Sequence, residues 1–133
     1  MAANNVKLAR AAYAAWNSGD ADWFLEHLSE DAEVRPLREL VGFDEIYRGR
    51  GGWKKFWKVW RGHWSSIEIR VERMEDLGDH GVLVLLKFEG VERASGAEAS
   101  IGVSHWLTFS DGLLTRITVM TPQAADRRRA ARS

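Results

Sequence analysis

The chain has 133 residues, a length typical of a single domain, and it carries 19 Lys plus Arg against 19 Asp plus Glu. The formal net charge is therefore zero, which gives no net positive field to attract nucleic acid or an acidic membrane, and we expect neither as a partner. The absence of cysteine excludes disulfides, thiolate catalysis and zinc held by thiolates.

Apolar runs in the sequence are short. The longest, about residues 82–86, is far too short to span a bilayer, and residues 1–7 lack the apolar segment typical of a secretion signal. We therefore expect a cytoplasmic protein. We also expect one domain over residues 1–133, with a folded core at about 5–122 and a solvated tail at 123–133, although Arg127–Arg129 in that tail leave contact with an acidic partner open.

Two helices are predicted at the N-terminal end. The first covers about residues 5–17, because apolar side chains recur on one helical face at Val6, Ala9, Tyr13 and Trp16. Gly19 is a natural helix stop, and Asp20 is a natural N-cap for a second helix at about 21–28.

An extended segment at 33–37 and a loop or lid at 37–48 separate these helices from a third, at about 52–62. Pro36 is expected to keep the extended segment at the edge or end of a sheet. The third helix has the sharpest pattern in the chain, a stripe of indoles at Trp53, Trp57, Trp60 and Trp64. This stripe predicts a face packed on a sheet, part of which can line a pocket. The segment Gly49-Arg50-Gly51-Gly52 indicates a turn; it leaves phosphate binding at the helix N-terminus as an alternative, but it matches neither a P-loop nor a dinucleotide-binding motif.

Beyond residue 66 the apolar period changes from helical spacing to two, which predicts strands at about 66–76, 82–91, 97–109 and 113–121. The 78–81 segment and Asp111-Gly112 are typical hairpin turns. Helices followed by an antiparallel meander indicate an α+β fold, in which the helices cover the concave face of the sheet.

Three motifs in this order resemble those of the SnoaL-like family, within the nuclear transport factor 2-like superfamily that also contains the ketosteroid isomerases. They are Tyr13-Ala14-Ala15-Trp16-Asn17-Ser18-Gly19-Asp20; Tyr47-Arg48-Gly49 followed by Trp53 and Phe56-Trp57; and Thr108-Phe109-Ser110-Asp111-Gly112 followed by Arg116-Ile117. The resemblance implies a cone-shaped, curved antiparallel sheet wrapped by three N-terminal helices, a cystatin-like roll, with a mostly apolar pocket inside. It does not imply one reaction, because this fold serves many.

By the same resemblance, Tyr13 occupies the place of the tyrosine that donates to the developing oxyanion in ketosteroid isomerases. Trp57 falls where an aromatic side chain packs beside that tyrosine. The catalytic carboxylate of those enzymes would fall at Pro36 and their second oxyanion donor at Ser104, so neither carboxylate is present. Tyr13 is thus the candidate catalytic residue, or a core tyrosine with a satisfied hydroxyl. The acidic residues closest to the expected pocket mouth are Asp44 and Glu45.

Strand alternation extends the expected pocket. With Ser104 taken as facing inward, Trp106 also faces inward, whereas Val103, His105 and Leu107 face outward. The expected ligand-binding residues are Tyr13, Trp16, Pro36, Phe56, Trp57, Trp60, Val84, Leu86, Phe88, Ser104, Trp106, Ile117 and Val119. The outward apolar residues predict a homodimer through the convex face of the sheet.

The aromatic pocket with few polar groups favours a compact, mostly apolar ligand, cyclic or not. If the protein is an enzyme, the resemblance implies isomerase, cyclase or dehydratase chemistry by acid and base groups, with no cofactor. Histidine spacing gives no metal site. The alternative is a non-catalytic ligand-binding protein or a dimeric interaction module.

The proline at position 36 generates a negative prediction. Because Pro36 cannot accept a proton, and loss of a general base commonly costs a factor of about a hundred or more, the protein should not isomerise ketosteroids at the rate of a true ketosteroid isomerase. A spectroscopic assay for the conjugated enone checks this. Robust turnover would mean that another group, such as Asp44 or Glu45, serves as the base.

Overall fold

A computed structural model describes residues 2–38 and 43–132, in which helices and strands follow the α+β order expected from the sequence. The helices are α1 (Ala2–Ser18), α2 (Ala21–His27), α3 (Gly49–His63) and α4 (Pro122–Arg132). The strands are β1 (Leu28–Arg35), β2 (Tyr47–Arg48), β3 (Trp64–Asp76), β4 (Val82–Glu92), β5 (Glu98–Ser110) and β6 (Leu113–Met120). A short 3₁₀ turn, Gly78–His80, joins β3 to β4.

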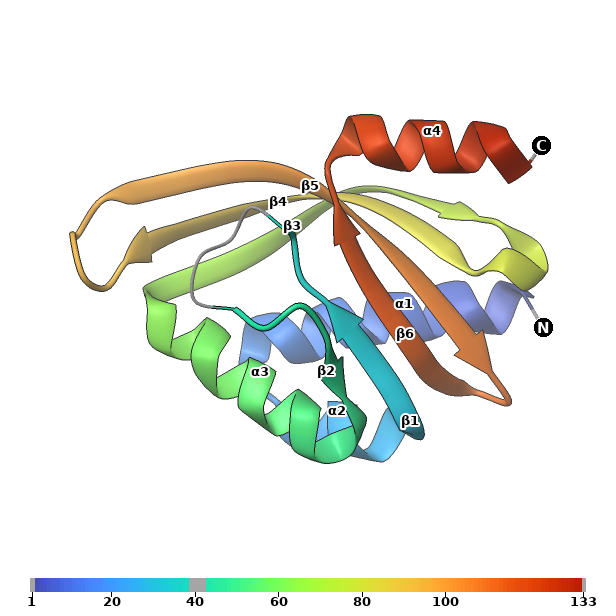
Figure 1. Cartoon of the computed structure of the whole chain (residues 1–133), viewed down its shortest axis with the longest axis horizontal. Helices are drawn as coiled ribbons and strands as arrows, with labels where there is room; N and C mark the ends of the chain where they lie inside the picture. Colours follow the sequence, from blue (N-terminus) through green and yellow to red (C-terminus); the bar gives the residue numbers. More distant parts are fainter. Residues whose placement is uncertain (1, 39–42, 133) are drawn as a thin grey trace.

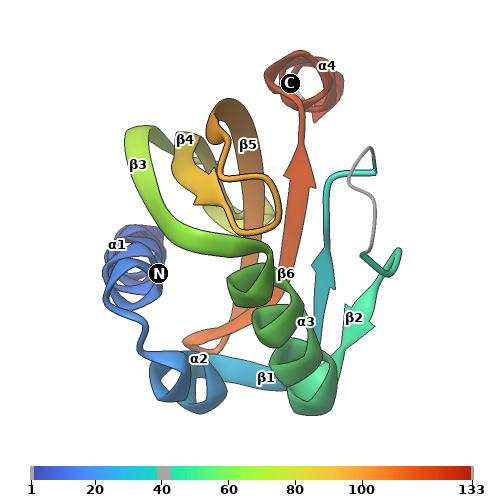
Figure 2. The same cartoon turned by 90° about the vertical axis from the view of Figure 1, so that its left-hand side faces the viewer.

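The strands form one curved sheet in the order β2-β1-β6-β5-β4-β3. The meander from β3 to β6 is antiparallel, as expected, but β1 pairs with β6 in the parallel direction, so the sheet is mixed and not wholly antiparallel. Register shifts between Trp64 and Ser66 and between Val71 and Arg73 interrupt the β3–β4 ladder. Such bulges increase the twist and bend of a strand, which accounts for the strong curl of the sheet in Figure 2.

Three helices cover one side of the sheet and the fourth lies on the other. Figures 1 and 2 show α1, α2 and α3 on the concave side, whereas α4 lies across the opposite face. The α2 helix begins at Asp20, whose side chain accepts a hydrogen bond from the backbone N–H of Trp23, as expected for an N-cap. The concave side is therefore enclosed by the sheet and three helices.

The C-terminal end of α1 is tied to the sheet by one side chain. The Asn17 amide donates to the carbonyl of Ile69 at 2.9 Å, and its carbonyl accepts from the N–H of Ile69 at 2.8 Å. Because β3 is the edge strand, these two bonds satisfy backbone groups that no further strand can reach. The tie fixes how the last turns of α1, which carry Tyr13 and Trp16, lie over the sheet.

The C-terminal residues differ from the solvated tail expected from the sequence, because 122–132 form α4. Ala125 packs against Leu83, Trp106 and Met120 in a second apolar cluster on the convex face. The Arg128 guanidinium lies 4.6 Å from the Trp106 ring centre, and Arg129 forms a 2.6 Å ion pair with Glu75. This helix closes the back of the central strands.

The helices described over 2–38 and 43–132 are each too short or too polar to cross a membrane. The loop or lid expected at 37–48 is described only in part, since residues 39–42 lie outside the described ranges. Its last two residues form β2, and α3 begins directly after it.

Gly81 offers a sharp test of the turn into β4. Its φ of 113° is one that L side chains rarely adopt, and an added Cβ would overlap the carbonyl oxygen of Leu107. We expect Gly81→Ala to lower the free energy of unfolding by about 3 kcal/mol or more. In the control Gly78→Ala, φ is 62° but the space is open, so the loss should be about 1 kcal/mol. Urea unfolding measures both; equal losses would contradict this description of the turn.

Candidate functional site

A small cavity lies between the concave face of the sheet and the helices. The volume open to the centres of water-sized molecules inside it is ≈ 40 Å³. Because atoms of such molecules reach about 1.4 Å beyond their centres, this space accepts roughly one six-membered ring. The described lining residues are Ala12, Tyr13, Trp16, Phe24, Val34, Pro36, Leu37, Phe56, Trp60, Ile69, Phe88, His105, Leu107, Leu114, Ile117 and Val119.

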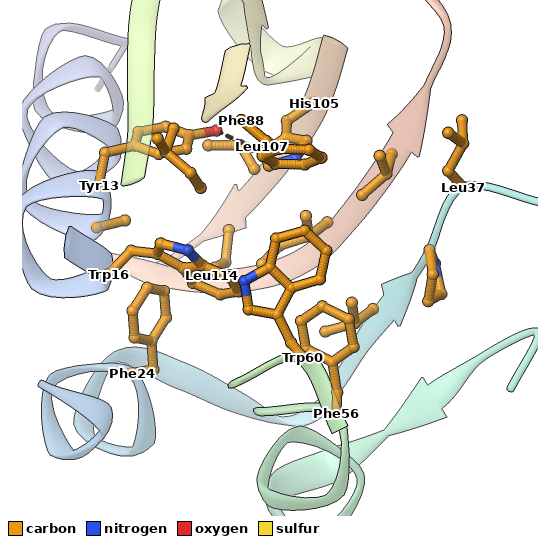
Figure 3. A pocket seen from close by; sticks show the side chains of 16 residues that line it. Tyr13, Trp16, Phe24, Leu37, Phe56, Trp60, Phe88, His105, Leu107 and Leu114 are labelled. Atoms are coloured by element: carbon orange, nitrogen blue, oxygen red, sulfur yellow. Dashed lines mark hydrogen bonds between the residues drawn. The ribbon is translucent and has the colours of Figure 1, made fainter. Parts of the chain in front are cut away.

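Each wall of the cavity comes from a different part of the chain. The α1 helix supplies Tyr13 and Trp16, and α3 supplies Phe56 and Trp60, while strands and the segment after β1 supply most of the rest. Figure 3 shows these side chains converging from opposite sides. The Trp16 ring contacts the rings of Phe24, Phe56 and Trp60 at centre distances of 5.9, 6.1 and 5.8 Å, so the aromatic wall is continuous.

The polar centre of the cavity is a hydrogen bond between the Tyr13 hydroxyl and His105 Nδ1, 2.8 Å long (Figure 3). The two rings are also stacked, with centres 5.8 Å apart and planes 22° apart. Tyr13 is 7% exposed and His105 8% exposed, so water has little access to either side chain. The helix α1 and the strand β5 thus meet at one buried polar contact.

Burial keeps both members of this pair uncharged. It raises the pKa of the Tyr13 phenol well above its usual value, and it lowers the pKa of His105 from 6.5 to about 3. In both cases the cause is loss of solvation of the charged form, with no neighbouring charge to offset it. At neutral pH the site therefore holds a neutral phenol and a neutral imidazole.

A neutral pair can be hydrogen bonded in two ways. The phenol O–H donates to Nδ1, which leaves Nε2 as an N–H donor, or Nδ1–H donates to the phenol oxygen, which leaves the O–H and the Nε2 lone pair free. His105 Nε2 has no hydrogen-bond partner among the described residues. The pair can therefore present either a donor or an acceptor to a ligand.

The sequence placed His105 on the wrong face of its strand. Val103, His105 and Leu107 face the concave side, and Ser104 and Trp106 face the convex side, opposite to our expectation. The register explains this, because β5 pairs His105 with Val84 on one side and Val119 on the other, and directly paired residues share a face. Trp106 instead packs under α4 and donates from Nε1 to the carbonyl of His80 at 2.7 Å.

This correction also removes the basis given for a homodimer. Val103 and Leu107 are 1% and 2% exposed within one chain, so they offer no apolar surface to a second copy. Of the large hydrophobic side chains in the described ranges, only Ile101 counts as exposed, at 37%. A homodimer stays a prediction, without those residues as its interface.

The other expected ligand-binding residues divide into two sets. Eight line the cavity: Tyr13, Trp16, Pro36, Phe56, Trp60, Phe88, Ile117 and Val119. Three lie outside its lining. Val84 and Leu86 are fully buried in the core, and the Trp57 ring packs against Trp16 with ring centres 5.1 Å apart and has the Arg61 guanidinium 4.9 Å from its centre.

The tyrosine hydroxyl also has a protein partner that the sequence did not suggest. The sequence left open whether the Tyr13 hydroxyl serves in catalysis or is satisfied in the core, and the structure bonds it to His105. The available signal was the apolar alternation of Ile101, Val103, Leu107 and Phe109, which favours the odd-numbered residues of β5 as the core face.

The acidic residues proposed for the pocket mouth do not line the cavity. Asp44 is exposed and forms a 2.8 Å ion pair with Lys55, and its backbone N–H donates to the Tyr47 hydroxyl. Glu45 is also exposed. Within residues 2–38 and 43–132, no three His, Asp or Glu side chains gather as a metal site would require.

Comparisons with known proteins agree with this architecture. A family model described as a SnoaL-like domain matches residues 9–117. A search of curated proteins gave no match.

Several solved structures share the fold at low identity. The structure of TerC co-crystallised with polyporic acid is 22% identical, with a TM-score of 0.78, over 94% of this chain and 96% of that one. A putative SnoaL-like polyketide cyclase from Jannaschia sp. CCS1 is 18% identical, with a TM-score of 0.77, over 94% and 90%. SalBIII, an epoxide hydrolase/cyclase-like enzyme in pyran ring formation in salinomycin, is 20% identical, with a TM-score of 0.70, over 87% and 88%.

The buried histidine predicts a pH dependence of stability. In the unfolded chain this histidine binds a proton below about pH 6.5, whereas in the folded protein His105 does so only near pH 3. The unfolded state therefore binds more protons in that window, and stability falls as the pH drops from 6.5 towards 3. The contribution of His105 should be about 1.4 kcal/mol per pH unit in the middle of the window.

Urea unfolding of the wild type and of His105→Gln, at neutral and mildly acidic pH, isolates the contribution of His105 to the pH dependence of the free energy of unfolding. The wild type should lose more stability than the variant on acidification, because the variant has no imidazole to titrate. Parallel losses in the two proteins would show that His105 is not buried in its neutral form.

Proposed function

Because this chain belongs to the SnoaL-like domain family, we propose that it is a small-molecule pocket protein that holds a compact, mostly apolar ligand against Tyr13 and His105 and performs cofactor-free acid–base chemistry on it. The observation that carries this proposal is the neutral Tyr13–His105 pair in an otherwise apolar cavity. Pockets of this kind, apolar with a few placed polar groups, are typical of ligand sites.

The size and lining of the cavity favour a compact and uncharged ligand. A space for roughly one six-membered ring requires side chains to move before a polycyclic compound enters. None of the described lining residues is Asp, Glu, Lys or Arg, so a charged ligand would lose its hydration without gaining a counter-charge.

One arrangement of the pair supplies both an acid and a base. With Nδ1–H donating to the phenol oxygen, the Tyr13 O–H is free to donate to a carbonyl oxygen of the ligand. The Nε2 lone pair is then free to take a proton from the carbon beside that carbonyl. The C–H electron pair becomes the C=C bond of an enolate, and the phenol stabilises the negative oxygen. In a ligand with a C=C bond next to that carbon the enolate is conjugated, and return of the proton from Nε2 to the far end of the conjugated system moves the double bond and completes an isomerisation.

The low basicity of His105 sets a condition on this chemistry. An imidazole with a pKa of about 3 is a weak base. A developing enolate beside it is an opposite charge in a poorly solvated site, which favours the protonated imidazole and raises its pKa. Proton transfer is therefore coupled to formation of the ion pair within the pocket.

Similar proteins support chemistry of this general kind. The structural neighbours include a protein described as a putative polyketide cyclase, an enzyme of pyran ring formation and a protein co-crystallised with polyporic acid. At such low sequence identity these neighbours share only the fold with this chain. The proposal of a ring-forming or isomerising reaction therefore rests on the Tyr13–His105 geometry.

A non-catalytic role is the alternative, as a ligand carrier or an interaction module. The absence of a carboxylate among the described lining residues and the weak basicity of His105 favour it. Binding of a ketone without any proton exchange would assign this role.

Hydrogen–deuterium exchange separates the two roles. Cyclohexanone in heavy water exchanges the protons beside its carbonyl when a base removes them, and nuclear magnetic resonance measures the rate. We expect the protein to accelerate this exchange and His105→Gln to lower the acceleration by about a hundredfold, since a general base typically contributes that much. Tyr13→Phe should lower it as well, because the enolate oxygen loses its donor.

Asp44→Asn is the matched control, since Asp44 is the exposed acidic residue paired with Lys55. Its exchange rate should equal that of the wild type. Exchange that survives in His105→Gln and disappears in Asp44→Asn would make the loop carboxylate the base, and it would contradict the proposed role of His105.

A further inference from the structure

Two buried hydrogen-bond donors in the cavity wall have no acceptor. The indole Nε1–H groups of Trp16 and Trp60 lack a partner among the described residues, although these side chains are only 7% and 3% exposed. Buried polar groups in native proteins nearly always have a partner, and a buried donor without one is a costly feature that needs an explanation.

The two indoles are neighbours in the same aromatic wall of the cavity. Their ring centres lie 5.8 Å apart with the planes inclined at 56°, and both residues line the cavity. Figure 3 shows the two ring nitrogens on the sides of the rings that are turned toward each other. Trp16 comes from α1 and Trp60 from α3, so packing of these two helices brings the donors together.

We propose that the indole N–H groups of Trp16 and Trp60 form a two-donor binding subsite for one oxygen atom of the ligand, distinct from the oxygen held by Tyr13. An oxygen acceptor has two lone pairs, so one carbonyl oxygen accepts from both donors. The ligand class is then a neutral, compact ring compound with two separated oxygen acceptors. This inference rests on the proposed function, because it assigns the far end of the same ligand.

The subsite selects a neutral acceptor. An indole N–H can only donate a hydrogen bond. A ligand oxygen at this position can accept from it, whereas a ligand N–H or C–H cannot. No cationic side chain is present among the described lining residues, so a carboxylate would be buried without a counter-charge. A carbonyl or ether oxygen meets both conditions.

The competing explanation is that the indole N–H groups point at aromatic ring faces. Such contacts are weak but real, and the aromatic cluster offers many ring faces. Trp53 and Trp64 also carry buried indole N–H groups without a partner, yet neither lines the cavity. These two residues therefore serve as internal controls, since ring-face contacts would apply to them equally.

The experiment compares two probes of similar shape, cyclohexanone with one oxygen and cyclohexane-1,4-dione with two. Binding to the wild type is followed in ¹H–¹⁵N spectra, where each tryptophan gives its own indole N–H signal. The dione should move the Trp16 and Trp60 signals in the direction of a new hydrogen bond, with the Trp53 and Trp64 signals unchanged. This measurement needs no variant, so it stands even if a substitution disturbs folding.

Affinities in variants give the second measurement. Trp16→Phe and Trp60→Phe keep an aromatic ring and remove the donor. Each should therefore lower the affinity for the dione by about five- to tenfold and the affinity for cyclohexanone by less. Trp53→Phe, the matched control, should leave the ratio of the two affinities unchanged.

The outcomes separate this inference from the proposed function. The two-donor subsite is overturned if cyclohexanone binds but the dione shifts neither the Trp16 nor the Trp60 signal. It is also overturned if Trp16→Phe and Trp60→Phe lower the affinities for the two probes equally. In both cases the Tyr13–His105 site stands. If neither probe binds, the ligand-binding function and the subsite are both overturned.

Discussion

The hydrogen bond between the Tyr13 hydroxyl and His105 Nδ1 lies where water is excluded, and the properties of the site follow from that exclusion. In a poorly solvated place the phenol and the imidazole stay neutral, and each is costly to leave without a partner. The bond therefore stabilises the fold and at the same time holds a donor and an acceptor at the cavity. A ligand group that accepts from the Tyr13 hydroxyl favours the arrangement in which Nδ1–H donates to the phenol oxygen, so the imidazole proton moves from Nε2 to Nδ1 while both side chains stay neutral.

The rest of the molecule holds these two side chains in place. Tyr13 is positioned by α1, whose end is fixed to β3 through the paired Asn17–Ile69 hydrogen bonds. His105 is positioned by β5, which is paired on both sides and has no free edge along this stretch. Behind it, the cluster of Leu83, Trp106, Met120 and Ala125 under α4 closes the convex face. Both faces of the central strands are therefore covered, which keeps the imidazole dry.

Local patterns in the sequence predicted the elements well. The helix periodicity and Gly19-Asp20 predicted α1, the turn and the cap of α2, and the period of two predicted the four meander strands with ends close to those observed. The family resemblance is confirmed by the match over residues 9–117. These features depend on residues near one another in the chain, which is why periodicity and capping rules detect them.

Features that depend on distant residues were predicted less well. The facing of β5 was fixed by assuming that Ser104 occupies a catalytic position, and a shift of one residue reverses every side chain on a strand. The parallel pairing of β1 with β6 has no local signal at all. The α4 helix escaped prediction because its sequence is mostly Ala and charged residues, and its contact with the sheet depends on Ala125, Arg128 and Arg129 meeting side chains from β3, β4 and β5.

The central claim is that a neutral imidazole at position 105 shares a hydrogen bond with Tyr13 inside the ligand cavity. Long-range ¹H–¹⁵N correlation spectra of the histidine ring test it directly, because they report separately on the two ring nitrogens. We predict one protonated and one unprotonated nitrogen for His105, a pattern that persists at mildly acidic pH and changes when cyclohexanone is added. A His105 ring that becomes doubly protonated near pH 6.5, the ordinary value for histidine, or that does not respond to the ketone, would contradict the account.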